Sequence, residues 1–189
     1  MGRSSQEQAR NNRSKIVEAA SKLFRRFGVE GLSVAYVMQA AGMTAGGFYK
    51  HFESKDALVQ EALLLSFGQS ARFLSHIKEE SGETGACSAI VQEYFAKRPL
   101  DQTCPILAFA GHVASNTAGP LARSAYRTGV KSIFSKFIGK DQHGEQDAKV
   151  MFAAMIGAGF LAHVLKDDKW VRAVQVAVET SAKRNAITD

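Results

Sequence analysis

The sequence contains few cysteines, which could form disulfides or bind metals, and few prolines, which interrupt helices. Only two cysteines occur in the 189 residues, Cys87 and Cys104, with neither a CxxC pair nor a Cys/His metal-ligand spacing. Three prolines are present, and no segment alternates apolar and polar residues convincingly with the period of a strand. These shortages argue against a disulfide framework, a zinc site and a β-rich fold.

Targeting and membrane-spanning segments are also lacking. The polar N-terminus has no apolar core of the kind found in signal peptides. The longest apolar run, Val150 to Leu165, contains two glycines and a histidine and is short for a membrane span. We expect this run to form a buried helix of a cytoplasmic protein that contacts no membrane and holds no metal or cofactor.

Positive charge is concentrated in the first third of the chain. Residues 1–55 contain nine basic and four acidic side chains, a net charge of +5, whereas residues 56–189 carry a net charge of only +1. A basic segment of this kind favours a polyanionic partner, although mildly basic proteins are common.

Helical periodicity extends over almost the whole sequence and predicts an all-α fold. The first predicted helix ends at Gly28, and Ser33 is placed to cap a second helix that ends at Gly42. Thr44 can cap a third helix over residues 44–50, and Ser54 a fourth. The apolar stripe of the first helix consists of Ile16, Ala19, Ala20, Leu23, Phe24 and Phe27.

Two domains are expected. Residues 1–55 form a helix-turn-helix unit, connected by a fourth helix over 53–80, and residues 56–189 form a second helical layer. Further helices are predicted at 85–97, 104–115, 120–137, about 146–166 and about 170–184.

The segment "GMTAGGFYKHFESK", residues 42–55, sets Gly46 and Gly47 directly before a cluster of aromatic and basic residues. Glycine weakens a helix, but it leaves room for a helix to approach DNA closely. We expect Phe48 and Phe52 to pack inward, whereas groups on the intervening residues reach the duplex. The alternative is a surface turn whose aromatic residues merely fill a core.

The stretch "FGVEGLSVAYVMQAAGMTAGGFYKHFESKDALV" resembles the DNA-binding domain of the tetracycline-repressor (TetR) family of bacterial regulators. The resemblance covers roughly residues 10–65. It implies a three-helix DNA-binding domain over residues 1–55 and an effector-binding and dimerisation domain over residues 56–189, in a homodimeric regulator that is released from a palindromic operator by a small effector. By position, it implies DNA contacts for Ser33, Thr44, Ala45, Gly46, Gly47, Tyr49, Lys50, His51 and Lys55.

Three positions depart from the family pattern. Gly47 stands where a small hydroxyl or methyl side chain is more frequent, Tyr36 where an acidic residue is common, and Met38 where alanine is common. The operator sequence therefore cannot be read from the chain, and Lys50 or Thr44 are the candidates for direct contacts with base edges.

The last two predicted helices are the candidate dimer elements. The run "VMFAAMIGAGFLAHVL" is apolar on more than one face, and its small residues allow close helix packing. We expect residues 146–166 and 170–184 to pair with their symmetry mates in a four-helix interface, as the resemblance also implies. The alternative is that both helices belong to the core.

Aromatic and weakly polar residues in the middle helices suit a cavity for an apolar or aromatic effector, although for any single residue a place in the core is the more frequent outcome. A histidine on an apolar helix needs a partner, which singles out His112 and His163. The candidate ligand-binding residues are Tyr94, Phe95, Cys104, Phe109, His112, Tyr126, Phe134, Phe160 and His163.

Cys104 opens an alternative mode of regulation. It precedes Pro105 at the predicted start of a helix, where the helix dipole can activate a thiol for sensing oxidants or electrophiles. A thiol enzyme using Cys104 and His112 is a further alternative, against which stands the lack of a GxSxG, P-loop, GxGxxG or HExxH motif. An architectural DNA binder would not need the large second domain.

Overall fold

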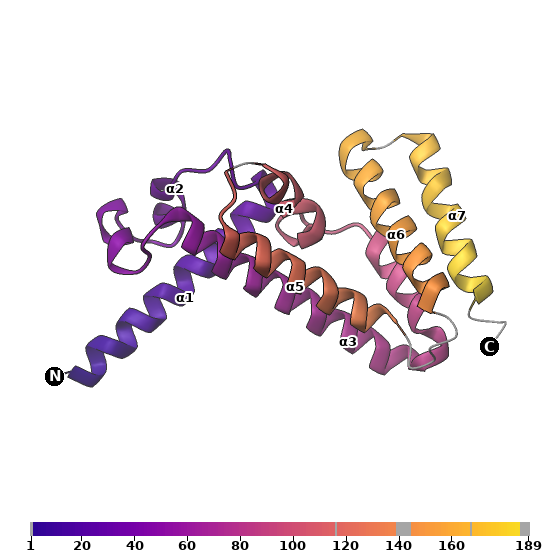
Figure 1. The fold of residues 1–189 in the computed structure, drawn as a ribbon, viewed down its shortest axis with the longest axis horizontal. Helices are drawn as coiled ribbons and strands as arrows, with labels where there is room; N and C mark the ends of the chain where they lie inside the picture. Colours follow the sequence, from indigo (N-terminus) through magenta and orange to yellow (C-terminus); the bar gives the residue numbers. More distant parts are fainter. Residues whose placement is uncertain (1, 116, 139–144, 167, 186–189) are drawn as a thin grey trace. The chain divides into compact units, whose positions relative to one another are not determined.

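The computed structural model describes residues 2–115, 117–138, 145–166 and 168–185, and these residues form helices and connecting segments without strands. The all-α prediction is confirmed. In chain order the elements are α1 (Gly2–Phe27), α2 (Val34–Ala40), η1 (Ala45–Lys50), α3 (Lys55–Phe95), η2 (Leu100–Gln102), α4 (Pro105–Ala114), α5 (Pro120–Phe137), α6 (Glu145–Leu165) and α7 (Lys169–Asn185), where η denotes a 3₁₀-helix (Figure 1).

The predicted apolar stripe of α1 forms part of the core. Ile16, Ala20 and Phe24 are completely buried, and α1 packs against α2, η2 and α4. Phe27, the last member of the predicted stripe, is half exposed instead, because α1 ends there. Gly28 then adopts a left-handed conformation (φ +77°), so the chain leaves the helix where the sequence predicted.

Helix α3 differs from the sequence prediction at its middle. The sequence predicted two helices, 53–80 and 85–97, separated by the loop "SGETG". Instead, Gly82 alone interrupts the helical backbone (φ 70°, ψ 170°), and helical residues continue directly on both sides of it. The left-handed conformation of a single glycine replaces the expected loop.

Packing divides the chain into two compact units. The first contains residues 1–69 and 98–130, and the second contains residues 70–97 and 131–189. The first unit therefore includes α4 in addition to the three N-terminal helices. This division by packing does not coincide with the boundary expected after residue 55, which separates the segment proposed to contact DNA from the rest.

At two glycines in the helices, an aromatic ring from another helix packs directly against the glycine backbone. In the first unit, a Cβ on Gly129 would lie 2.3 Å from the Phe67 ring, and in the second unit a Cβ on Gly159 would lie 2.5 Å from the Tyr94 ring. Both distances are well below van der Waals contact. Glycine at these positions lets an aromatic ring lie directly against a helix backbone.

In the second unit, α6 and α7 lie side by side as an antiparallel pair (Figure 1). The expectation that α6 is a buried helix is wrong for the single chain: only 17% of its most apolar 18-residue window is buried. By length and hydropathy alone, α6 is also the one described helix that could cross a membrane. Its exposed apolar surface needs another cover, which is considered below.

Candidate nucleic-acid interface

The turn between α2 and η1 is fixed by hydrogen bonds of the backbone. Gly42 is left-handed (φ +74°), its N–H donates to Gln39 O at 2.9 Å, and the N–H of Met43 donates to Met38 O at 2.9 Å. This pair of bonds is the Schellman motif, which closes a helix end and reverses the chain. The predicted helix-stop at Gly42 is confirmed.

Helix η1 has a buried and an exposed side. Phe48 and Phe52 are 1% and 2% exposed, and their rings stack with centroids 5.6 Å apart. Tyr49, only one residue from Phe48, is 78% exposed. The other exposed positions of this segment are Thr44, Ala45, Gly46 and Lys50, and Gly47 and His51 are partly exposed. The two phenylalanines thus fasten η1 to the protein, while the predicted DNA-contacting residues between and before them remain accessible.

Thr44 occupies the N-cap position of η1, but its side chain makes no capping hydrogen bond. The capping role predicted for its hydroxyl is therefore wrong. Since η1 is a short 3₁₀-helix and not a regular α-helix, its first N–H groups are arranged differently from those the prediction assumed. The exposed Thr44 hydroxyl is not committed to the helix.

Ser33 and Lys55 both have roles within the protein. Ser33 Oγ accepts a hydrogen bond from the N–H of Tyr36 at 3.2 Å, which confirms it as the cap of α2. Lys55 Nζ donates to Val29 O at 2.8 Å and ties the start of α3 to the turn after α1. An ammonium group has three donors, so this bond leaves two for the predicted phosphate contact.

Sequence reasoning missed Arg13. Its guanidinium bonds His51 O at the end of η1 and the carboxylate of Glu61 on α3, which are 38 and 48 positions away in the chain. Periodicity and motif spacing carry no signal for contacts over such separations. Only the folded arrangement reveals this contact.

His112 has the partner that its position on an apolar helix requires. Its ring is buried, and Nδ1 lies 2.7 Å from Oε1 of Glu30, in the connection between α1 and α2. Because the carboxylate accepts, Nδ1 is the donor. The hydrogen bond from His112 lowers the pKa of Glu30, and Thr117 Oγ1 adds a second bond at 3.2 Å. The other ring nitrogen, Nε2, is buried without a hydrogen-bond partner among the described residues.

The remaining candidate ligand residues of the first unit are engaged in packing. Phe109 is completely buried and meets Phe24 edge-to-face with centroids 6.3 Å apart. Tyr126 donates its hydroxyl to Ile106 O at 2.8 Å, and burial, followed by the charge of Cys104, raises the pKa of Tyr126 to about 12.

The candidate ligand residues of the second unit are dispersed. Tyr94 and Phe95 pack edge-to-face on α3, and Phe134 meets Phe152 with centroids 5.2 Å apart. Phe160 and His163 are exposed on α6. The ligand-binding assignments of these residues remain predictions, and Phe160 belongs to the exposed apolar surface of α6.

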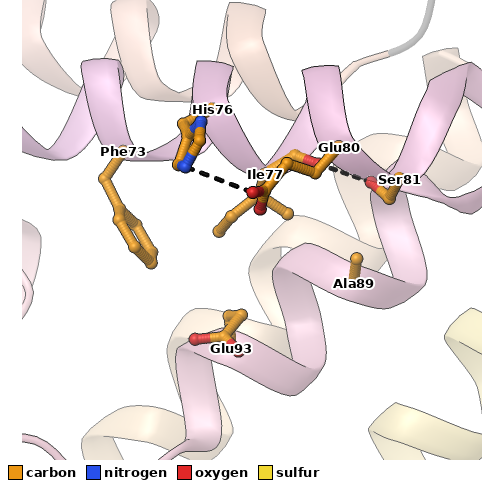
Figure 2. A pocket seen from close by; sticks show the side chains of 7 residues that line it. All are labelled: Phe73, His76, Ile77, Glu80, Ser81, Ala89 and Glu93. Carbon is orange, nitrogen blue, oxygen red and sulfur yellow. Dashed lines mark hydrogen bonds and ion pairs between the residues drawn. The ribbon is translucent and has the colours of Figure 1, made fainter.

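The second unit contains a groove of about 450 Å³ between the two arms of α3, on either side of Gly82. Figure 2 shows Phe73 and Ile77 pointing into it from one arm and Ala89 from the other. Its remaining lining residues are His76, Glu80, Ser81 and Glu93. The volume lies in the range of small-molecule sites. The groove shares no residue with the nine predicted ligand-binding positions.

The pair α6 and α7 exposes many large apolar side chains. They are Val150, Phe160, Val164 and Leu165 on α6, and Trp170 and Val176 on α7, each between 49% and 61% exposed. Monomeric proteins seldom expose so many large apolar residues on neighbouring helices, and such surfaces usually mark an interface.

The described residues contain no cluster of three or more His, Cys, Asp or Glu side chains arranged to hold a metal ion.

The fold and the exposed face of η1 together define a helix-turn-helix protein, in which a short second helix, a glycine turn and an outward-facing third helix are supported by α1.

Comparison with known proteins agrees with this class. Residues 16–62 match the sequence pattern described as "Bacterial regulatory proteins, tetR family". The chain is 34% identical over 104 residues to the HTH-type transcriptional regulator TtgR of Pseudomonas putida, covering 53% of this chain and 49% of that protein. It is 36% identical over 66 residues to the regulator AcrR of Shigella flexneri, covering 35% of this chain and 31% of that protein. The chain thus spans half or less of the length of these curated relatives.

Solved structures match over nearly the whole length. The reduced form of Escherichia coli NemR aligns with a TM-score of 0.74 at 17% identity, covering 90% of this chain and 96% of that one. SCO4454, a TetR-family regulator of Streptomyces coelicolor, aligns with a TM-score of 0.75 at 18% identity, covering 100% and 96%. At these identities the likeness establishes the fold. Residues 16–62 therefore carry the pattern of the TetR family of bacterial regulatory proteins, and the curated relatives that the chain matches over about half of its length are transcriptional regulators.

Proposed function

We propose that the protein is a homodimeric transcriptional repressor that binds a palindromic operator and is released from it by a small molecule. The observation that carries the proposal is the division of residues 44–52, which contain η1, into a buried side with Phe48 and Phe52 and an accessible side that includes Thr44, Tyr49 and Lys50. A bacterial DNA regulator of this kind works in the cytoplasm.

Phosphate contacts and base contacts have different sources in this arrangement. Tyr49 and Lys50 carry donors suited to phosphate oxygens, which set the position and register of the protein on DNA. Thr44 and Lys50 are the candidates for base edges in the major groove. The net charge of +5 on residues 1–55 adds a sequence-independent attraction that should weaken strongly with salt.

We expect a dimer because a single helix-turn-helix contacts too few base pairs to select an operator. One helix-turn-helix reads few base pairs, and two modules on a palindrome place their recognition helices about 34–36 Å apart. The exposed apolar side chains of α6 and α7 support a dimer interface, because pairing the two helices with their symmetry mates would remove them from water. Burial in this interface would also account for the exposed apolar surface of α6, so that no membrane is needed to cover it.

The dimer surface can be tested by introducing one charge. Phe160→Glu should give a monomer in size-exclusion chromatography with light scattering, since a carboxylate would be buried in an apolar interface. Leu121→Glu is the matched control, because Leu121 is as exposed (54% against 53%) but lies on α5. A dimeric Phe160→Glu variant would count against this interface.

The effector is proposed to act on α3. This helix starts at Lys55, beside η1, and its later residues line the groove around Gly82. A ligand that shifts α3 would change the presentation of η1 and disturb the spacing of the half-sites. A hundredfold loss of operator affinity requires a coupling of only about 2.8 kcal/mol.

Selection of bound sequences from random duplex DNA tests the function directly. The proposal predicts enrichment of a palindromic motif whose half-sites are about one helical turn apart. The selected duplex then serves as the probe for effectors. Recovery of no sequence preference would favour an architectural DNA binder.

A second mode of release, through Cys104, is supported by its surroundings. Cys104 is the N-cap residue of α4, and the charge of Cys104 acts on the guanidinium of Arg25. Arg25 itself is held by a bond from Nε to Thr103 O at 2.7 Å. A helix N-terminus and a nearby arginine both favour a thiolate. Cys87 is different, because burial raises the pKa of its thiol.

Alkylation can distinguish the roles of the two cysteines in release from the operator. N-ethylmaleimide should modify Cys104 well before Cys87 and should release the operator, and Cys104→Ser should abolish this release. Cys87→Ser is the matched control and should respond like the wild-type protein. Equal release of Cys104→Ser would remove the thiol mode while leaving the reversible effector in place.

A further inference from the structure

Arg13, in the middle of α1, contacts three residues from two other parts of the helix-turn-helix region at once. One Nη donates to the carbonyl oxygen of His51, and the other pairs with Oε1 of Glu61. Nε makes a further bond to the same carboxylate, 3.3 Å from Oε2. The guanidinium carbon also lies 4.2 Å from the centroid of the Phe52 ring. One side chain thus joins α1, the end of η1 and α3.

These contacts act where η1 has least support of its own. A 3₁₀-helix of six residues has poor hydrogen-bond geometry, and its last carbonyl groups have no partner within the helix. The guanidinium bonds the carbonyl oxygen of His51, the C-cap residue directly after the helix, and its positive charge suits a helix C-terminus. A forked arginine–carboxylate pair also fixes direction, since both N–H groups must meet both oxygens.

The direction of the exposed side of η1 depends on this end of the helix. Phe52 stacks on Phe48, and Arg13 covers Phe52 while holding the neighbouring His51 carbonyl. A shift of that carbonyl would rotate η1 about its buried phenylalanines. Rotation would move the side chains on the opposite side, including Tyr49 and Lys50.

We propose that Arg13 is a positioning residue for operator recognition, which fixes η1 at the angle needed to read base edges. The inference rests on the proposed function, because it assigns η1 to the DNA. Base-edge hydrogen bonds are specific and depend on geometry, whereas phosphate contacts carry no sequence information. Arg13 therefore governs selectivity between the operator and other DNA more than it governs affinity for DNA in general.

Arg13→Lys tests the proposal, because lysine keeps the charge but lacks the planar fork. Binding to the selected operator and to an unrelated duplex of equal length is measured by fluorescence anisotropy, and thermal unfolding is followed in parallel. We expect operator affinity to fall about tenfold, the range of a lost base contact, while affinity for the unrelated duplex and its salt dependence stay near the wild-type values. Unchanged selectivity, or an equal loss on both duplexes, would overturn the proposal.

Two further variants complete the experiment. Glu61→Gln removes the charge that anchors the guanidinium and should reduce selectivity in the same direction with the fold retained. Lys15→Ala is the matched control on the same helix: Lys15 is exposed, and its loss should weaken binding to both duplexes alike. If Arg13→Lys fails to fold, Glu61→Gln decides, and wild-type selectivity in it refutes the inference. A wild-type protein that selects no sequence would instead refute the proposed function.

Discussion

The two glycines of η1 allow the requirements of folding and of DNA binding to be separated. A Cβ added to Gly46 would have no neighbour within 4 Å, and one added to Gly47 would lie 3.7 Å from Met38 Cε, an ordinary contact. Neither glycine has a positive φ. Nothing within the protein therefore requires glycine at either position.

Gly46→Ala should consequently leave the fold intact and weaken DNA binding. Replacing glycine at a compatible position stabilises a protein by about 0.4–1 kcal/mol, through the entropy of the unfolded chain. If η1 lies against the duplex, however, the added methyl group meets DNA, and overpacking of this kind costs about 1–3 kcal/mol. That range corresponds to a loss of affinity of roughly 5- to 150-fold.

The assay compares binding of the selected operator with thermal unfolding. Gly111→Ala is the control, because Gly111 lies in α4 and is equally free of neighbours within 4 Å. Both variants should unfold at or slightly above the wild-type temperature, and only Gly46→Ala should lose operator affinity. Wild-type affinity in Gly46→Ala would refute the idea that these glycines make room for DNA. A marked fall in its unfolding temperature would show that they serve the fold.

Two further predictions concern stability. The His112 hydrogen bond lowers the pKa of Glu30, so its stabilising contribution is present above the unfolded-state value and is lost as the pH falls through the folded-state value. Glu30→Gln should therefore unfold at a lower temperature than the wild-type protein at pH 7, and the difference should shrink toward pH 3; a difference independent of pH would contradict this coupling. Gly129→Ala would place a methyl group 2.3 Å from the Phe67 ring, and it should destabilise the protein by about 1–3 kcal/mol in chemical denaturation. Unchanged stability would show that Phe67 can move aside without cost.

The sequence predicted best what short-range chemistry decides. The helix stops at Gly28 and Gly42 follow from the left-handed conformation that glycine adopts without strain, and the Ser33 cap follows from a hydroxyl three residues before an N–H. The inward packing of Phe48 and Phe52 was also predicted, and the N–H of Phe52 donates to Phe48 O at 3.0 Å, a bond over only four residues.

What the sequence did not predict depends on distant contacts or on a partner. The bond from Lys55 to Val29 O and the contacts of Arg13 join segments 26 to 48 positions apart, which no local pattern encodes. The sequence left open what covers α6, because an apolar helix looks the same whether its own chain or a second copy covers it. The groove around Gly82 was not predicted, because the chain reverses at this single glycine and not in the loop that the sequence led us to expect.

The central claim is that the accessible side of η1 contacts duplex DNA. Backbone amide chemical shifts measured by NMR during titration with the selected operator test it most directly. The account predicts that the largest shift changes fall on residues 44–51, with small changes in α6 and α7. Changes that leave residues 44–51 unaffected while the complex forms would contradict it.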